Sequence, residues 1–159
     1  MMILPPGSPE ATVVAVLSET TENLLFEEAV LKEILDAPPT FDDTFCWAIM
    51  EVLDPITGPI SLFVPQPLVV RFAEGVLSVP AEEISQEMLM DGLAETLNTL
   101  VGRLVARCLR PDESYKLSLP ATGCGEPILF SGESRFFHFL VSDQFMFLQV
   151  TTALLKARG

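Results

Sequence analysis

The sequence predicts an α+β domain in which a largely antiparallel sheet packs against long helices. Two long helical stretches are each followed by short apolar runs of strand character, and turn-forming residues separate those runs. The predicted order is long helix, hairpin, short helix, and then long helix, strand, hairpin. We therefore expect two related helix-then-strands halves that build a single sheet.

The first half opens with a long helix, expected over Ala11–Ile34, where apolar residues recur at helical spacing until the prolines at 38–39. Two strands are then expected, over Phe45–Leu53 and Ile60–Val64. The segment between them, 54–58, reads Asp-Pro-Ile-Thr-Gly, which has turn chemistry. These two strands are thus predicted to form a hairpin.

Two further helices follow. The first is short, over Gln66–Leu77, and carries a proline in its first turn, where a missing N–H costs least. The second, Ile84–Leu109, has the clearest helical period in the chain and ends before Pro111. Its apolar stripe consists of Met90, Leu93, Leu97, Leu100, Val101, Leu104 and Cys108.

The second half is expected to end in strands. Tyr115–Leu119 alternates like a brief strand, and Pro120–Pro127 is rich enough in glycine and proline to predict a loop. Arg135–Val141 and Phe145–Thr151 are aromatic and β-branched runs separated by a short polar turn, so they predict a terminal hairpin.

Length and charge limit the possible functions. The 159 residues fit one domain, 1–159, with residues 1–9 as a flexible N-terminal lead. Nine basic residues against 22 acidic ones give a net charge of −13, which repels phosphate backbones and anionic lipid surfaces. We therefore expect no nucleic acid and no membrane among the partners.

The expected location is the cytoplasm. No apolar run is long enough to span a membrane, and the N-terminus lacks the basic start of a secretory signal. Cys46, Cys108 and Cys124 are odd in number and match no CxxC spacing, which favours reduced, structural thiols over a disulfide framework or a zinc site.

Four residues of the Ile84–Leu109 helix share the side opposite its apolar stripe. Asp91, Glu95, Asn98 and Gly102 lie at i, i+4, i+7 and i+11, which at about 100° per residue is a narrow sector. Such residues are ordinarily just the solvated face of a helix. Gly102 argues for more, because a mid-helix glycine costs about 1 kcal/mol relative to alanine and core packing does not require this one. A glycine there lets another surface approach a carboxylate and an amide.

The stretch from Asp91 to Gly102, DGLAETLNTLVG, resembles the signature of the CheC/CheX/FliY family of chemotaxis phosphatases. In that signature Asp or Ser is followed four positions on by Glu and three later by Asn, and a proline stands some twenty residues downstream, here Pro120. The strand, proline and short helix before it, 58–77, are also similar to the family. One signature per chain is closest to CheX, so the resemblance implies a CheC-like fold.

The resemblance also implies an activity, which is hydrolysis of the aspartyl-phosphate of a CheY-like response regulator. Asn98 would position the attacking water, and Glu95 would dock to the lysine of the phosphorylated receiver domain. Asp91 and Gly102 would contact the receiver. The Mg²⁺ would be supplied by the receiver, so this chain is expected to bind no metal and no cofactor. A homodimer, paired through an edge strand of the C-terminal hairpin, is also implied.

Two departures and two alternatives accompany this interpretation. Thr96 and Thr99 stand where the family commonly has Leu and Met. The main alternative is a non-catalytic adaptor that binds a receiver and leaves its phosphate in place. A flagellar-switch component is the second alternative, and for it we would expect a further C-terminal module after the last strands. His138, within an aromatic strand, is expected to be structural.

Overall fold

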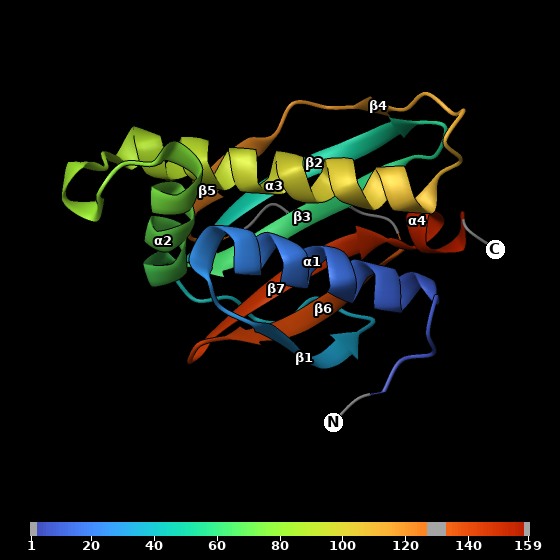
Figure 1. Ribbon diagram of the computed structural model, residues 1–159, viewed down its shortest axis with the longest axis horizontal. Helices are drawn as coiled ribbons and strands as arrows, with labels where there is room; N and C mark the ends of the chain where they lie inside the picture. Colours follow the sequence, from blue (N-terminus) through green and yellow to red (C-terminus); the bar gives the residue numbers. More distant parts are fainter. Residues whose placement is uncertain (1–2, 127–132, 158–159) are drawn as a thin grey trace.

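The computed structural model describes residues 3–126 and 133–157. Its centre is a seven-stranded sheet with the order β1-β6-β7-β3-β2-β4, in which β5 also pairs with β2 and every pairing is antiparallel. The long helices α1 and α3 lie side by side over one face of the sheet (Figure 1). The predicted α+β class is confirmed.

The elements follow in chain order: α1 (Pro9–Leu25), β1 (Ala29–Leu35), β2 (Phe45–Asp54), β3 (Gly58–Pro65), α2 (Gln66–Leu77), the 3-10 helix η1 (Ala81–Glu83), α3 (Gln86–Cys108), β4 (Lys116–Leu117), β5 (Ala121–Cys124), β6 (Ser134–Val141), β7 (Gln144–Thr151) and α4 (Thr152–Lys156). The β2–β3 hairpin, α2, α3 and the β6–β7 hairpin agree with the sequence prediction. The short C-terminal α4 was not predicted.

The first helix ends earlier than its periodicity predicts. α1 stops at Leu25, and Phe26 caps it in the left-handed region (φ 57°), donating its N–H to the carbonyl of Glu22. Ala29–Leu35 then pairs antiparallel with β6 as strand β1. The prediction of helix through Ile34 is wrong because pairing with β6 satisfies these backbone groups and outweighs a modest local helical pattern.

The two predicted halves exchange their outer strands. β3 and β7 pair at the centre of the sheet, and each is flanked by its own hairpin partner, β2 or β6. β1 from the first half then pairs with β6, while β4 and β5 from the second half pair with β2. The C-terminal hairpin is therefore interior to the sheet, and the expectation that it supplies an edge strand is wrong.

The segment predicted as a loop at Pro120–Pro127 contains strand β5. Ala121–Cys124 pairs with β2, which places Cys124 directly opposite Cys46, and these two cysteines form a disulfide. The prediction of reduced thiols is wrong for this pair, since the register that brings them together is a tertiary feature. Cys108 is buried in the core, and Pro127 lies outside the described residues.

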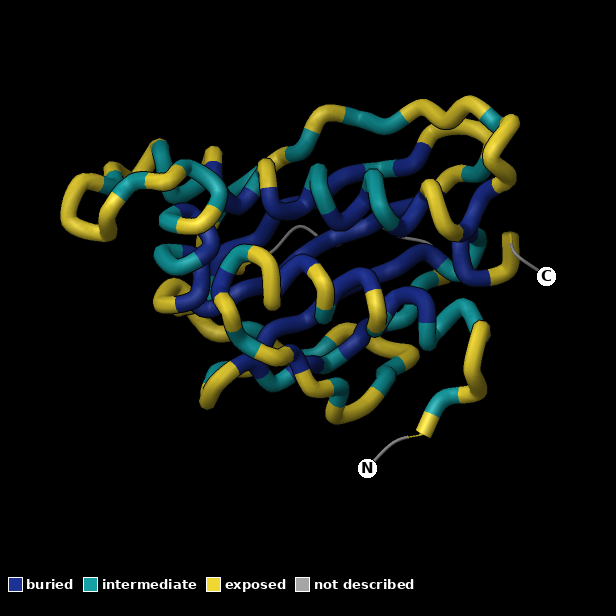
Figure 2. The backbone as a smooth tube through the Cα atoms, viewed as in Figure 1, coloured by how far each residue is buried: buried dark blue, intermediate teal, exposed yellow. Residues whose placement is uncertain are grey.

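Apolar side chains cover both faces of the sheet. The main core lies between the sheet and the helices, and Leu93, Leu97, Leu100 and Leu104 of α3 are each 0% exposed within it. A second cluster on the opposite face is formed by Trp47, Ile49, Phe63, Phe136 and Phe147. Figure 2 shows the buried side of α1 and α3 turned toward the sheet. The rotation of α3 about its axis is thus set by its leucines.

Helices α2 and α3 pack closely where α3 carries Gly92. A Cβ atom added at Gly92 would lie 2.7 Å from both Cα and Cβ of Ala73 in α2, too near for any side chain without movement of a helix. At Gly102, by contrast, no atom beyond its chain neighbours and the nearby backbone of its own helix lies within 4 Å of an added Cβ. Gly92 is required by packing and Gly102 is not.

We predict opposite effects of substituting these two glycines. Gly92→Val should lower the free energy of unfolding by about 1–3 kcal/mol, because it overpacks the α2–α3 contact. Gly102→Ala should raise it, by up to about 1 kcal/mol, because the helix gains propensity without a clash. Urea unfolding followed by circular dichroism measures both. Equal stability of Gly92→Val and wild type would contradict the close approach.

Candidate functional site

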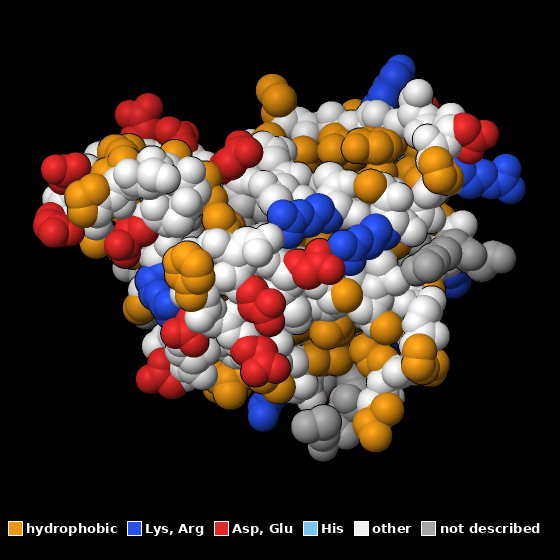
Figure 3. All heavy atoms as spheres, viewed as in Figure 1, with side chains coloured by type: hydrophobic (Ala, Val, Ile, Leu, Met, Phe, Trp, Pro, Cys, Tyr) orange, Lys and Arg blue, Asp and Glu red, His pale blue; other side chains and the backbone are white. Residues whose placement is uncertain are grey.

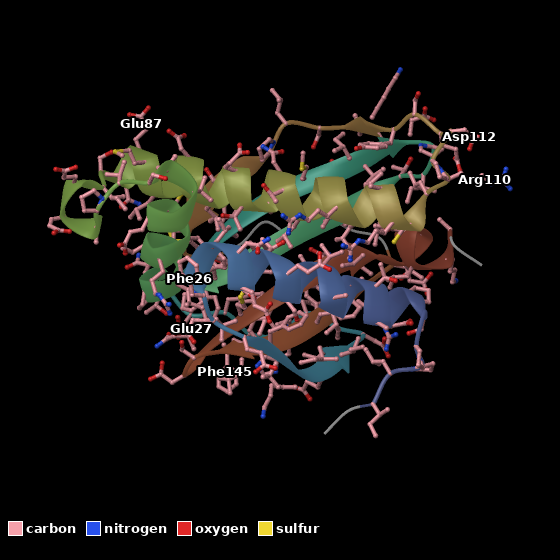
Figure 4. The ribbon with its side chains drawn as sticks, viewed as in Figure 1. Phe26, Glu27, Glu87, Arg110, Asp112 and Phe145 are labelled. Atoms are coloured by element: carbon pink, nitrogen blue, oxygen red, sulfur yellow. A yellow bond between two sulfur atoms is a disulfide. The ribbon has the colours of Figure 1, made fainter. Side chains whose placement is uncertain are left out.

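Helix α3 carries the candidate site, and its start is fixed by a cap. The Ser85 side-chain oxygen accepts a hydrogen bond from the backbone N–H of Met88 at 3.2 Å. Figure 4 shows Glu87 near the N-terminus of α3 and Arg110 just beyond its C-terminus. An acidic residue at the start and a basic one at the end both complement the helix dipole. The helix is therefore well defined along its length.

The four predicted site residues lie on the side of α3 that faces away from the core. Asp91 and Glu95 are exposed, while Asn98 and Gly102 are partly exposed. Among the described residues, neither the Glu95 carboxylate nor the Asn98 amide makes a hydrogen bond or ion pair within the chain. Both groups are thus available to a second molecule, one helical turn apart.

The two threonines that depart from the family pattern take different positions. Thr96 is fully buried, and its hydroxyl donates to the carbonyl oxygen of Gly92 at 2.8 Å. This bond satisfies the only polar group that Thr96 brings into the core, and the side chain points away from the site. Thr99 is partly exposed and lies one residue from Asn98. Only Thr99 borders the exposed face.

Helix α1 holds the C-terminal half of α3 in place. The Arg103 guanidinium donates to the hydroxyl of Thr20 at 3.1 Å, and Arg107 forms an ion pair with Glu19 at 2.7 Å. Figure 3 shows a carboxylate close to two basic side chains at the centre of this face. The Arg107–Glu19 ion pair is half exposed and so stabilises little, but both contacts limit the positions that these side chains take.

The opposite end of the site is acidic. Glu82, Glu83, Glu87 and Asp91 are all exposed on η1 and the first turns of α3. Figure 3 shows acidic side chains gathered over this end of the molecule. The potential beside Glu95 is therefore negative, which favours the approach of a cationic group on a partner.

The remaining candidate residues lie elsewhere or form no site. His138 pairs in register with Phe147 of the second cluster, stacks on its ring and contacts the Glu33 carboxylate at 3.2 Å.

No group of three or more His, Cys, Asp or Glu able to hold a metal occurs within residues 3–126 and 133–157. In the same ranges no helix is both long and apolar enough to cross a membrane.

Sequence reasoning missed the structural neighbours of the site. It identified Pro120 and predicted a strand over Tyr115–Leu119, where β4 lies, but it missed β5 and the pairing of both strands with β2. It also missed the contacts from α1, because residues 83 and 88 positions apart carry no local signal of contact. Strand alternation around Lys116 was the one sequence signal that pointed to this neighbourhood.

We predict that the candidate side chains contribute little to folding. Glu95→Ala and Asn98→Ala should each change the free energy of unfolding by less than about 0.5 kcal/mol, since neither group has a partner to lose. Leu97→Ala, between them on the buried side, should cost about 2–5 kcal/mol. Chemical denaturation compares the three variants, and a large loss for Glu95→Ala or Asn98→Ala would show that the residue has a structural role.

Comparison with known proteins identifies the family. The model of the chemotaxis phosphatase CheX matches residues 46–142. The fold is similar to a putative chemotaxis protein of Desulfovibrio vulgaris Hildenborough (14% identity, 89% of this chain and 94% of that one, TM-score 0.71). It is also similar to CheX of Desulfovibrio desulfuricans (11% identity, 89% of this chain and 96% of that one, TM-score 0.71).

A third similar structure is a CheX-CheY-BeF3-Mg+2 complex from Borrelia burgdorferi (14% identity, 91% of this chain and 97% of that one, TM-score 0.72). No curated protein sequence matches this chain. The family model spans more than half of the chain and includes the site helix from its first to its last residue. The chain belongs to the CheX family of chemotaxis phosphatases.

Proposed function

We propose that this protein accelerates hydrolysis of the aspartyl-phosphate of a CheY-like receiver domain. The observation that carries the proposal is the exposed pair on α3, in which a carboxylate at Glu95 and an amide at Asn98 have no partners among the described residues. Membership of the CheX family supports it. So does the similar Borrelia CheX, whose structure is a complex with CheY.

Asn98 would position the attacking water. Hydrolysis of an acyl phosphate requires a water in line with the leaving oxygen and charge compensation on the phosphoryl oxygens. A side-chain amide donates and accepts hydrogen bonds at the same time, so it can orient a water without exchanging a proton with it. Asn98 is partly exposed on α3, so its amide can reach a second molecule. It acts as a positioning group and not as a nucleophile.

Glu95 would fix how the receiver docks. Its exposed carboxylate lies one turn before Asn98, so an ion pair with a receiver lysine sets the register of the amide over the phosphoryl group. Asp91, one turn earlier, would add an edge contact. Gly102 would leave clearance for the receiver surface, since nothing lies within 4 Å of the place that a side chain would take.

The receiver would bring its own Mg²⁺, so the metal belongs to the substrate. The residues of this chain near the site are two carboxylates, an amide and a glycine along one helix, a set suited to docking and water orientation. The proposed function would place the protein in the cytoplasm, where receivers are phosphorylated. A homodimer is part of the proposal, with β1 as the surface to test, because β1 pairs only with β6 among the described strands.

A non-catalytic adaptor remains the second candidate. The α3 face could bind a receiver without placing a water, and the phosphate would then stay in place. The two candidates differ in one observable, the lifetime of the phosphorylated receiver. A catalyst shortens it at substoichiometric concentration, whereas an adaptor leaves it unchanged or lengthens it.

We predict that Asn98→Ala lowers the rate of receiver dephosphorylation by about 100-fold or more, because the water loses its positioning group. The matched control is Asn23→Ala, which removes an exposed amide from α1 and should leave the rate unchanged. Loss of radiolabelled phosphate from the receiver measures the rate. Full activity of Asn98→Ala would remove the proposed mechanism.

We predict that Glu95→Ala raises KM by about 10- to 150-fold, since it removes one charge-assisted contact of about 1.5–3 kcal/mol from the complex. Combined with substitution of the receiver lysine, the loss should be non-additive. Glu28→Ala, which removes an exposed carboxylate outside α3, serves as the control. Additive losses from Glu95 and the lysine would mean that the two side chains do not meet.

A further inference from the structure

A leucine on the connection between β4 and β5 is almost fully exposed. Leu119 is 90% exposed, although it lies between two paired strands. Within residues 3–126 and 133–157, two other large apolar residues are about as exposed, Ile3 in the N-terminal lead and Phe26 at the end of α1. Neither lies between two strands. Single exposed apolar side chains are common, so the exposure of Leu119 alone carries no function.

What distinguishes Leu119 is that its backbone is held on both sides. Ser118 donates its N–H to the Glu51 carbonyl at 2.9 Å, and its side-chain oxygen accepts from the Glu51 N–H at 2.8 Å. Pro120 follows directly and restricts the backbone further. β5 then pairs with β2 from Ala121 onward. The leucine is therefore presented from an ordered support, and binding through it requires little new ordering.

The same connection lies beside the site helix. Figure 1 shows the chain passing from β4 along α3 toward β5, and β5 contacts α3. A protein interface of standard size covers about 800 Å² per partner, a patch about 16 Å in radius. A globular domain seated on Glu95 and Asn98 thus has room to extend over α3 toward β5 and the connection that precedes it.

We propose that Leu119 is an anchor for the receiver domain, inserting into an apolar depression beside the receiver's phosphorylated pocket. This inference rests on the proposed function, which supplies the receiver as the occupant of the α3 face. A side chain contributes strongly to an interface when it fills a well-packed pocket on the partner and loses contact with water in the complex. Glu95 and Asn98 would contact the phosphorylated pocket, and Leu119 would contact the apolar surface next to it. It would thus help to select among receivers that share the same pocket chemistry.

The test is binding to the receiver carrying beryllofluoride with Mg²⁺, a stable mimic of the phosphorylated state. Isothermal titration of Leu119→Ser should give a dissociation constant about tenfold higher than wild type, whereas Leu119→Met should stay close to wild type. Ile3→Ser is the matched control, because it removes an equally exposed aliphatic side chain from the N-terminal lead and should not alter binding. All variants should unfold at the temperature of wild type.

Steady-state dephosphorylation adds a second measurement, in which Leu119→Ser should raise KM and leave kcat unchanged. An unchanged dissociation constant, a lowered kcat at unchanged KM, or an altered oligomeric state of Leu119→Ser would each overturn the inference. Because binding to the mimic requires no hydrolysis, this result is separate from the proposed activity. A wild-type protein that binds through Leu119 and fails to speed hydrolysis would contradict the activity alone.

Discussion

The packing of α3 against the sheet determines what this protein presents to other molecules. Four leucines of α3 are completely buried, and burying each is worth about 1.5–3 kcal/mol relative to exposure. Turning the helix by a quarter would bring these leucines into water and push the Glu95 carboxylate toward the core, where an unpaired charge is far more costly. The leucines on one side thus fix the carboxylate and the amide on the other. The geometry of the site is therefore set by the buried leucines, which do not contact a partner themselves.

The sheet makes this arrangement rigid. Because each half donates its outer strand or strands to the hairpin of the other half, neither can move without breaking strand pairs. α2 is then brought against α3 so closely that only glycine fits at position 92, one residue after Asp91. Arg103 and Arg107 connect the other end of α3 to α1. α3 is thus held by the sheet, by α2 and by α1, and a helix fixed in this way suits a reaction that depends on the placement of a water.

Much of this was visible in the sequence because the signals were periodic. The leucine spacing of α3 predicted both its extent and the outward side of Asp91, Glu95, Asn98 and Gly102. The apolar and aromatic runs bounded by turn residues predicted the two hairpins. Features set by distant pairing were not visible. β1 has a helix-like apolar pattern and β5 has a loop-like composition. Both form strands because their backbones pair with the outer strand of a hairpin, β6 for β1 and β2 for β5. The Cys46–Cys124 bond follows from the register of β5, 78 residues away along the chain.

The proposed function depends on whether the outward face of α3 shortens the lifetime of the phosphate on a receiver. The most direct measurement is the decay of phosphorylated receivers from the same organism, each with a substoichiometric amount of this protein. We expect at least one receiver to lose its phosphate many times faster than alone, with several turnovers for each molecule of protein. Unchanged or slower decay for every receiver, together with measurable binding, would contradict catalysis and identify the face as an adaptor surface.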